Sequence, residues 1–457
     1  MLKSLVISLS ALIFSVFLLM GGNTFVMTLL GVNLGLKDIA PTLIGSIMVC
    51  YSLGFMAGSV YGSKVIKRVG HIRAFAVFSA FLASSTLVFP LTDSIWVWAL
   101  LRAFGGFAVA GCFIVIESWF SAVASNENRG TLFFAYQIST YLAATGGQLL
   151  IGFVDPQAFI PFTIGAIVLT AALVPLSLSR VDAPTIEHVE RISLKAIIKV
   201  VPVGLIAALC GGVLISSFYA MAPVYAIQVG LEVDQLSYFM AASMFAFILL
   251  AWPLGRLSDT LERSKVMIGI NISVAASALG LVTIGHYNIW MLIGFSALYT
   301  GLVASIYPVA VAMTNDRMEA RHIVAASTTL LLSYGLGSSV GPLFSSSMMT
   351  WLGPDGLYFG SAGVALLLGV YTWYWRVNYK MVDVADQTEY IQSPAETVGV
   401  ISELDPRNEE FVDVPLEEVF PHLEEEELAE AQACQMELDL PEPEVDPEAE
   451  ESILVPH

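Results

Sequence analysis

Two ionisable residues stand inside stretches that are otherwise apolar. Arg102 lies within LLRAFGGFAVAG and Glu117 within CFIVIESWF. A charged side chain in hydrocarbon is costly, so each is expected to face protein or a water-filled cavity. A carboxyl group in low dielectric favours its neutral form, which suits reversible protonation, and a guanidinium binds anionic groups or tunes a nearby acid. These residue types therefore predict proton or anion chemistry.

The spacing of Arg102 and Glu117 limits how they can act together. They are fifteen residues apart, which is about 22 Å along an α-helix and close to four turns plus 60°. Direct pairing is excluded at that distance, but both side chains can project toward one cavity. Two alternatives stay open. Arg102 reaches outward and anchors its helix, or Glu117 reaches the membrane interface and pairs with Arg129 or a loop residue.

The composition excludes most soluble classes of protein. Of the 457 residues, 56% are hydrophobic and 13% are charged, and the mean hydropathy is +0.75. Soluble domains carry about 25% charged residues, so the solvent of this chain is expected to be lipid. The four cysteines show no C-x-x-C or Cys/His spacing. We therefore expect free thiols, with neither a structural disulfide nor a metal site.

Twelve apolar stretches are long enough to cross a bilayer as helices, for which about 20 residues are needed. They cover approximately 5–31, 42–63, 72–92, 95–119, 131–152, 159–179, 200–225, 235–257, 265–285, 289–314, 323–350 and 356–376. The first is too long for the core of a cleavable signal peptide and is predicted to be retained. The chain is thus predicted to be an all-α membrane protein with 12 transmembrane helices in two six-helix bundles, residues 1–180 and 200–378, joined by a cytoplasmic loop, 181–199.

Basic residues are distributed asymmetrically over the connections between these stretches. Seventeen Lys and Arg residues lie on one side, and only Lys37 lies on the other. Cytoplasmic loops carry the excess of positive charge in membrane proteins. Both termini are therefore predicted to be cytoplasmic, with the chain in a bacterial inner membrane.

The C-terminal segment, residues 379–457, differs in composition from the rest of the chain. It holds 24 of the 39 acidic residues against Lys380 and Arg407. Such a segment buries too little apolar surface to offset the entropy of ordering, so a largely disordered cytoplasmic tail is predicted. A tail that docks a cytosolic partner, or that contacts the basic loops, is the alternative.

The two halves resemble each other at an offset near 192 residues. The loop SKVIKRVG after the second stretch matches GRLSD after the eighth, and Arg129 matches Arg321. Tyr141 followed by GGQLL matches Tyr334 followed by GPL. Matched loops with matched charge indicate a repeated six-helix unit.

These features resemble the major facilitator superfamily, whose loop between spans 2 and 3 has the pattern G-x-x-x-D-R/K-x-G-R/K-R/K. The resemblance implies that both copies of this loop form a cytoplasmic latch between the halves. Lys67, at the position of the Asp, lies beside Arg68 and Gly70 in the N-half copy. The C-half copy keeps Gly255, Asp259, Arg263 and Lys265. Simple positive-inside topology is the alternative reading of the basic residues.

The segment around Arg102 resembles the superfamily's arginine motif of span 4, which is associated with proton-coupled transport. The resemblance covers residues 1 to about 378. The segments ESW, NRG, GGQLL, WPLGRLSD and YGLGSSVGP together resemble the YcaD-type subgroup of bacterial permeases.

In this superfamily spans 1, 4, 7 and 10 surround a central cavity, so the resemblance implies that their polar residues line a solute pathway. The candidates are Asn23, Ser216, Ser217, Tyr219, Tyr299, Ser305 and Tyr307, with Gln137, Tyr141 and Gln148 of the fifth span as secondary ones. Amides and phenols suit hydroxyl, carboxylate or amide groups of a solute. An interhelical hydrogen bond is the alternative role for each.

The expected function is secondary active transport of a small solute by alternating access, coupled to protons through Glu117 with Arg102. Multidrug efflux by proton antiport is one alternative. A membrane scaffold or sensor that does not transport, and whose tail recruits a partner, is another. The sequence has no nucleotide-binding loop, nucleophile motif or metal pattern, so no enzymatic activity, cofactor or nucleic-acid binding is expected.

Overall fold

A computed structural model describes residues 2–37, 39–123, 129–178, 201–318, 323–387 and 390. These residues form helices and no strands. The predicted cytoplasmic loop 181–199 and the tail beyond Tyr390 lie outside them.

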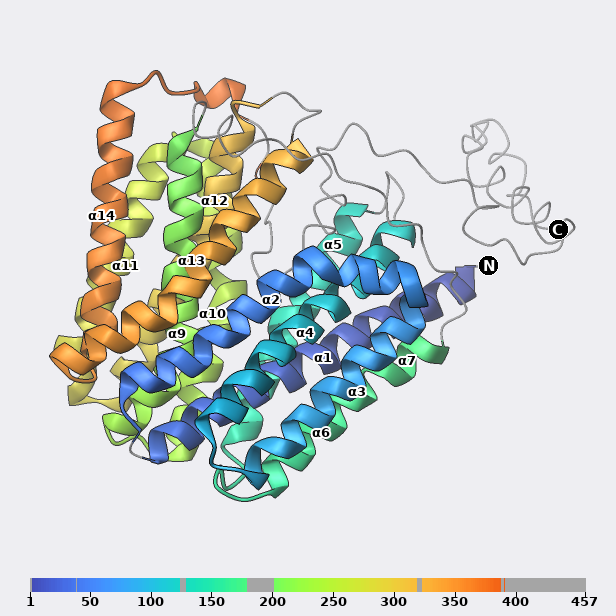
Figure 1. The fold of residues 1–457 in the computed structure, drawn as a ribbon. Helices are drawn as coiled ribbons and strands as arrows, with labels where there is room; N and C mark the ends of the chain where they lie inside the picture. The colour runs from blue at the N-terminus through green and yellow to red at the C-terminus, as the bar shows by residue number, and fades with distance from the viewer. Residues whose placement is uncertain are drawn as a thin grey trace, which may run out of the picture.

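The first half contains α1 to α7, and the second half contains α9 to α14 (Figure 1). The first-half helices are α1 (Leu2–Leu36), α2 (Pro41–Val69), α3 (His71–Val88), α4 (Ile95–Val123), α5 (Arg129–Ile151), α6 (Ile160–Ala171) and α7 (Leu173–Leu178). The second-half helices are α9 (Pro202–Gln228), α10 (Val233–Thr260), α11 (Arg263–Thr283), α12 (Ile289–Asn315), α13 (Ile323–Leu352) and α14 (Gly356–Asn378). Among the described residues, three short 3₁₀ helices accompany them, at Phe89–Leu91, Gly285–Tyr287 and Val384–Asp386.

The predicted architecture of twelve transmembrane helices is confirmed. The helices α6 and α7 form one span, Ile160–Leu178, that is interrupted at Ala172. Pro175 explains the interruption, because proline cannot donate a hydrogen bond to the carbonyl four residues earlier. Ten of the spans are long and apolar enough to cross a membrane on their own. The other two, α5 and α13, are less apolar and pack against the opposite half.

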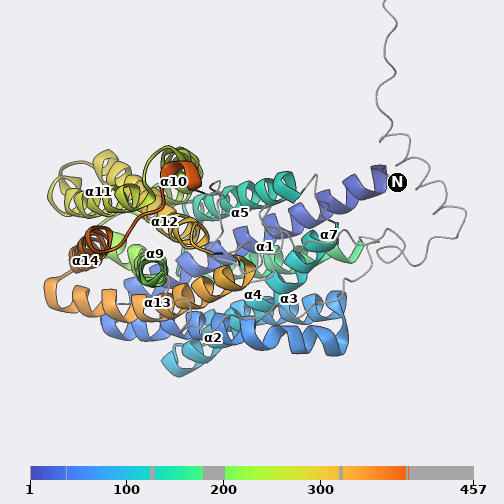
Figure 2. The ribbon, with the colours of Figure 1, turned by 90° about the horizontal axis from the view of Figure 1, so that it is seen from above.

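Three helix pairs form most of the contact between the two halves. These are α2 with α13, α5 with α10, and α1 with α9, and Figure 2 shows the first two pairs side by side. Glycines permit the closest approaches. A Cβ on Gly45 would lie 2.1 Å from the Ser346 Oγ, and one on Gly152 would lie 2.6 Å from the Ser237 Oγ.

These close contacts gather at one end of the molecule. Gly45 begins α2, Gly152 follows α5 and Ser346 lies near the end of α13, so all three are at the helix ends remote from the N-terminus. Figure 1 shows the two bundles converging at that end. The halves are therefore closed there.

Candidate functional site

Arg102 is the most unusual charged residue of the described helices. It lies in α4 with only 4% of its surface exposed. Its Nη1 donates to the Met27 Sδ at 2.7 Å, and its Cζ lies 4.4 Å from the centre of the Tyr51 ring. The other two nitrogens, Nε and Nη2, are buried and have no hydrogen-bond partner. A thioether is a weak acceptor, so the guanidinium keeps most of its donor capacity unused.

A layer of half-buried side chains separates Arg102 from the surface. Asn23 and Met27 stand four residues apart on α1 and therefore share one face of the helix. The Asn23 amide donates to the Tyr51 hydroxyl at 3.1 Å. Asn23, Met27 and Tyr51 are all half-buried, whereas Arg102 is buried behind them. We call these four residues the Arg102 cluster.

The packing of α2 on α4 positions this cluster. A Cβ on Gly106 would lie 2.1 Å from the Tyr51 carbonyl oxygen, and one on Gly54 would lie 1.8 Å from the Ala103 carbonyl oxygen. Only glycine allows the two backbones to approach so closely. The approach brings the Tyr51 ring over the Arg102 guanidinium, where the ring face attracts the cation.

Glu117 is fully buried in the last third of α4. The Tyr136 hydroxyl donates to the Glu117 Oε1 at 3.1 Å, and the Tyr136 ring packs edge-on against Phe120 with 5.3 Å between the ring centres. Glu117 of α4 is thus buried beside two aromatic rings and bonded to a tyrosine of α5. The predicted alternative partner, the Arg129 side chain, is not among the described side chains.

The structure does not bring Arg102 and Glu117 together. Both lie on the continuous helix α4, so the helical rise separates them by about 22 Å. The Arg102 cluster lies toward the closed end of the first half, and Glu117 lies toward the opposite end.

The three candidates of the fifth span lie on α5, the helix that packs against α10 of the other half. The Tyr141 ring meets the Phe247 ring of α10 edge-on, with 5.4 Å between the ring centres. Gln148 lies two turns further along the same helix face and is fully buried, and neither atom of its amide has a hydrogen-bond partner. Gln137 is 4% exposed.

The hydroxyl candidates of the second half bond to backbone carbonyls. Ser216 donates to the Gly212 carbonyl at 2.7 Å, Ser305 to the Gly301 carbonyl at 3.1 Å, and Ser217 to the Gly341 carbonyl of α13 at 2.9 Å. Such bonds stabilise helices and helix pairs within a membrane. In this conformation the three hydroxyls are therefore occupied by the protein itself.

The aromatic candidates of the second half pack against other rings. Tyr299 is 1% exposed and meets Tyr358 edge-on, and Tyr307 is 3% exposed and meets Tyr334. Tyr219 is half-buried beside Phe247, with 6.5 Å between the ring centres. Of these three, Tyr219 alone keeps a sizeable exposed surface.

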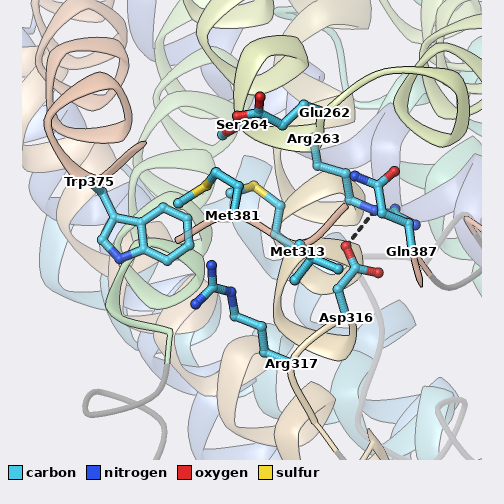
Figure 3. Close-up of a pocket in the computed structure, with 10 residues that line it drawn as sticks. Glu262, Arg263, Ser264, Met313, Asp316, Arg317, Trp375, Met381 and Gln387 are labelled. Carbon is cyan, nitrogen blue, oxygen red and sulfur yellow. Dashed lines mark hydrogen bonds and ion pairs between the residues drawn. The ribbon is translucent and has the colours of Figure 1, made fainter. Parts of the chain in front are cut away.

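The C-half latch residues form a network of ion pairs. Arg263 is 2% exposed, and its Nε lies 2.8 Å from the Asp316 Oδ2 while its Nη2 donates to the Asp259 Oδ1 at 3.4 Å. Figure 3 shows Arg263 and Asp316 facing one another beside Met313. Paired and buried in this way, Arg263 joins the ends of α10, α11 and α12.

A second ion pair stands beside the first, at the start of α11. Arg376 binds Glu262 through two bonds, Nε to Oε1 at 2.6 Å and Nη2 to Oε2 at 3.1 Å. The Lys265 Nζ lies 3.2 Å from the Glu262 Oε2, and the Ser264 hydroxyl donates to Oε1. The Arg376 guanidinium, helped by Ser264 and Lys265, holds the pKa of Glu262 at about 2.

The N-half latch residues lie differently. Lys67 and Arg68 are exposed at the end of α2, and Gly70 separates α2 from α3 with φ of 85°. This backbone conformation explains the glycine, because other residues adopt it rarely. In the first half, the loop thus presents its positive charge to the surroundings.

The residues after α14 pack against the C-half latch. The Tyr390 backbone N–H donates to the Asp259 Oδ1 at 2.9 Å, and a Cβ on Gly255 would lie 2.2 Å from the Tyr390 ring. Arg317 donates to the Lys380 carbonyl, and its guanidinium lies 4.5 Å from the centre of the Trp375 ring. The part of the predicted tail that the structure describes therefore folds back onto the second half.

Sequence reasoning missed Tyr51, Met27 and Tyr136. A phenol or a thioether within an apolar stretch gives no signal of its own, because either one is common in a hydrophobic core. One clue was available for Met27, since it follows Asn23 by four residues and must share its helix face.

Comparisons with known proteins give a consistent result. The family model described as Major Facilitator Superfamily matches residues 9–252 and 228–416. An uncharacterized MFS-type transporter of Enterobacter sp. (strain 638) is 27% identical over 350 residues, which cover 74% of this chain and 88% of the relative. The uncharacterized MFS-type transporter YcaD of Shigella flexneri is also 27% identical, over 345 residues, with the same coverage of each chain. The expected resemblance to the YcaD-type subgroup is thereby confirmed.

Solved structures share the fold at low sequence identity. The nucleoside transporter NupG superposes with a TM-score of 0.66 at 14% identity, covering 82% of this chain and all of that one. A bacterial homolog of the human lysosomal transporter Spinster, in an inward-facing and unoccupied conformation, gives 0.61 at 13% identity, covering 90% and 99%. The D-xylose-proton symporter gives 0.60 at 15% identity, covering 84% and 99%.

Proposed function

This chain belongs to the Major Facilitator Superfamily, and we propose that it is a secondary active transporter that moves a small solute by alternating access. The two bundles, residues 1–180 and 200–378, rock against each other about a central site. Relatives that carry the name MFS-type transporter support transport as the activity. The number of long apolar helices is that of a multi-pass membrane protein.

The observed conformation corresponds to one state of that cycle. The closest contacts between the halves gather at the helix ends remote from the N-terminus. The charge asymmetry, seventeen basic residues against one, supports an orientation with both termini in the cytoplasm of a bacterium and the chain in its inner membrane. In that orientation the end at which the halves are closed lies on the outside, as expected for an inward-facing state.

The proposed driving force is a proton gradient, with Glu117 as the carrier. The supporting observation is a carboxyl group that is fully buried between α4 and α5 and held by the Tyr136 hydroxyl. A buried acid exchanges protons reversibly when its surroundings change between the two states of the cycle. The proton is then a partner of the transporter together with the solute.

The test is solute-driven proton movement in liposomes that contain the purified full chain and a pH-sensitive dye. Sugars, nucleosides and carboxylic acids are added in turn, and the internal pH is followed. We expect one class to change the internal pH, and Glu117→Gln to abolish that change while the protein stays folded. The matched control is Glu262→Gln, which removes a carboxylate paired with Arg376 outside the proposed pathway. Unchanged coupling in Glu117→Gln contradicts the assignment.

The same liposomes separate the alternatives. Proton movement driven by varied lipophilic drugs would identify a multidrug efflux antiporter instead. Deletion of residues 391–457 leaves solute flux intact in a transporter, whereas a scaffold that recruits a cytosolic partner through its acidic tail loses its function.

A further inference from the structure

We infer that the transported solute carries a carboxylate group, and that the Nε and Nη2 edge of Arg102 binds it. The inference rests on the proposed transport function and adds the chemical class of the solute. It starts from a buried guanidinium, 4% exposed, with two donors that no other group uses.

A second arginine of the same chain shows what the unused edge is suited to hold. Arg376 presents its Nε and Nη2 to the two carboxylate oxygens of Glu262, at 2.6 Å and 3.1 Å. In Arg102 the same two nitrogens are free. They point along one edge of a rigid planar group, which matches the two oxygens of a carboxylate. The missing partner of Arg102 is therefore the kind of group that Arg376 already has.

The part of the chain that the structure describes supplies no anion for Arg102. No carboxylate of the described residues forms an ion pair with it, and its one hydrogen-bond acceptor is the Met27 sulfur. Leaving a buried charge without a strong partner costs free energy. An anionic ligand that reaches the free edge removes this cost, so the site favours a carboxylate over its neutral analogue.

The residues around Arg102 provide a route and further contacts. Met27 and Tyr51 are half-buried, and both touch Arg102. The Met27 side chain is unbranched and has several rotatable bonds, so it can move aside at low cost. The Tyr51 ring covers a face of the guanidinium, so a ligand meets the Nε and Nη2 edge in the guanidinium plane, and it does so only after the side chains that bury this edge have moved. The half-buried Asn23 amide can bond to another polar group of the same solute.

The charge balance favours a monoanion. The Arg102 cluster contains one cation, one amide, one phenol and one thioether, which neutralise a single negative charge. A phosphate ester would bring a second charge with no counter-ion in the cluster, and burying that charge is costly.

Binding is tested directly on the full chain in lipid nanodiscs. The probes are formate, acetate and benzoate, each matched with its neutral amide at equal ionic strength, and inorganic phosphate is a separate probe. Ligand-observed NMR reports binding, and the midpoint of thermal unfolding reports stabilisation by mass action. We expect at least one acid to bind and its amide not to.

Three variants assign the binding to the free edge. Arg102→Lys keeps the positive charge but removes the paired Nε and Nη2 donors. The acid should therefore bind more weakly, on the order of tenfold or more. Met27→Leu removes the sulfur acceptor at similar volume and should bind the acid at least as well as the wild type. Arg376→Lys is the matched control on the paired arginine and should leave acid binding unchanged.

Several results would overturn the inference. They are amides that bind as well as acids, undiminished acid binding in Arg102→Lys, no binding by any acid up to tens of millimolar, or binding of phosphate alone. The transport proposal fails separately. If acids bind through Arg102 but neither acids nor other solutes move protons or cross the liposome membrane, the site exists and the transporter does not.

Discussion

The two halves of the molecule treat buried arginine in opposite ways. Arg102 in the first half and Arg263 in the second are 4% and 2% exposed. Arg263 is held between Asp316 and Asp259, whereas Arg102 has a thioether and an aromatic ring. A guanidinium between two carboxylates has its charge compensated and joins helix ends. A guanidinium with free donors can still bind an anionic ligand. On our proposal, this difference separates a structural arginine, Arg263, from a ligand-binding one, Arg102.

The largest expected effect is on folding stability, and it sets the two arginines apart. Arg263→Met removes a counter-ion from the buried Asp316 carboxylate, 4% exposed, so we expect a loss of about 3–5 kcal/mol. Arg102→Met leaves no carboxylate behind and should change stability by less than about 1 kcal/mol. Thermal unfolding of both variants in the same detergent measures the difference. Equal losses would mean that Arg102 is as structural as Arg263.

The next effect concerns how the first half positions its arginine. Gly106→Ala places a methyl group against the Tyr51 carbonyl oxygen, where a Cβ would lie 2.1 Å away, so α2 must move from α4. We expect a cost of about 1–3 kcal/mol and weaker binding of any acid that uses the Arg102 cluster. Gly105→Ala is the neighbouring control, because its nearest contact would be Leu82 at 3.9 Å. If both variants keep full stability and binding, the close approach of α2 and α4 does not position Tyr51.

The sequence predicts one side of this comparison better than the other. The twelve spans follow from hydropathy, because the bilayer fixes helix length. Arg102 and Glu117 stand out because charge in hydrocarbon is costly. By contrast, the Tyr51 and Met27 contacts depend on which glycines let α2 and α4 meet, and on the register of α1 against both. The register of one helix against another cannot be predicted from a single sequence.

The sequence predicts only part of the C-half network of ion pairs, because the remaining partners are distant in the chain. Asp259 and Arg263 stand four residues apart and share the loop motif. Their third partner, Asp316, lies more than fifty residues further along, at the end of α12. A larger separation, 114 residues, hides the pairing of Glu262 with Arg376. Helix packing, which no local pattern encodes, brings these charges together.

The smallest expected effect tests whether the C-half charges take any part in proton coupling. The bond from Arg376 holds the pKa of Glu262 at about 2, below its ordinary value of 4.5. A lowered folded-state pKa means that the pair contributes its full stability above pH of about 4.5 and loses it as the pH falls toward 2. Between pH 5 and 8 the pair is therefore constantly charged.

It follows that Glu262→Gln should lower stability by about 1–2 kcal/mol to the same extent at pH 5 and at pH 8. Thermal unfolding at the two pH values measures this, and the pH dependence of solute-driven proton movement should keep its wild-type midpoint. A stability difference that changes across this range, or a shifted midpoint, would place a titrating group in the second half. The proposed contrast between the paired Arg263 and the ligand-binding Arg102 would then no longer separate the two halves, because both halves would exchange protons during transport.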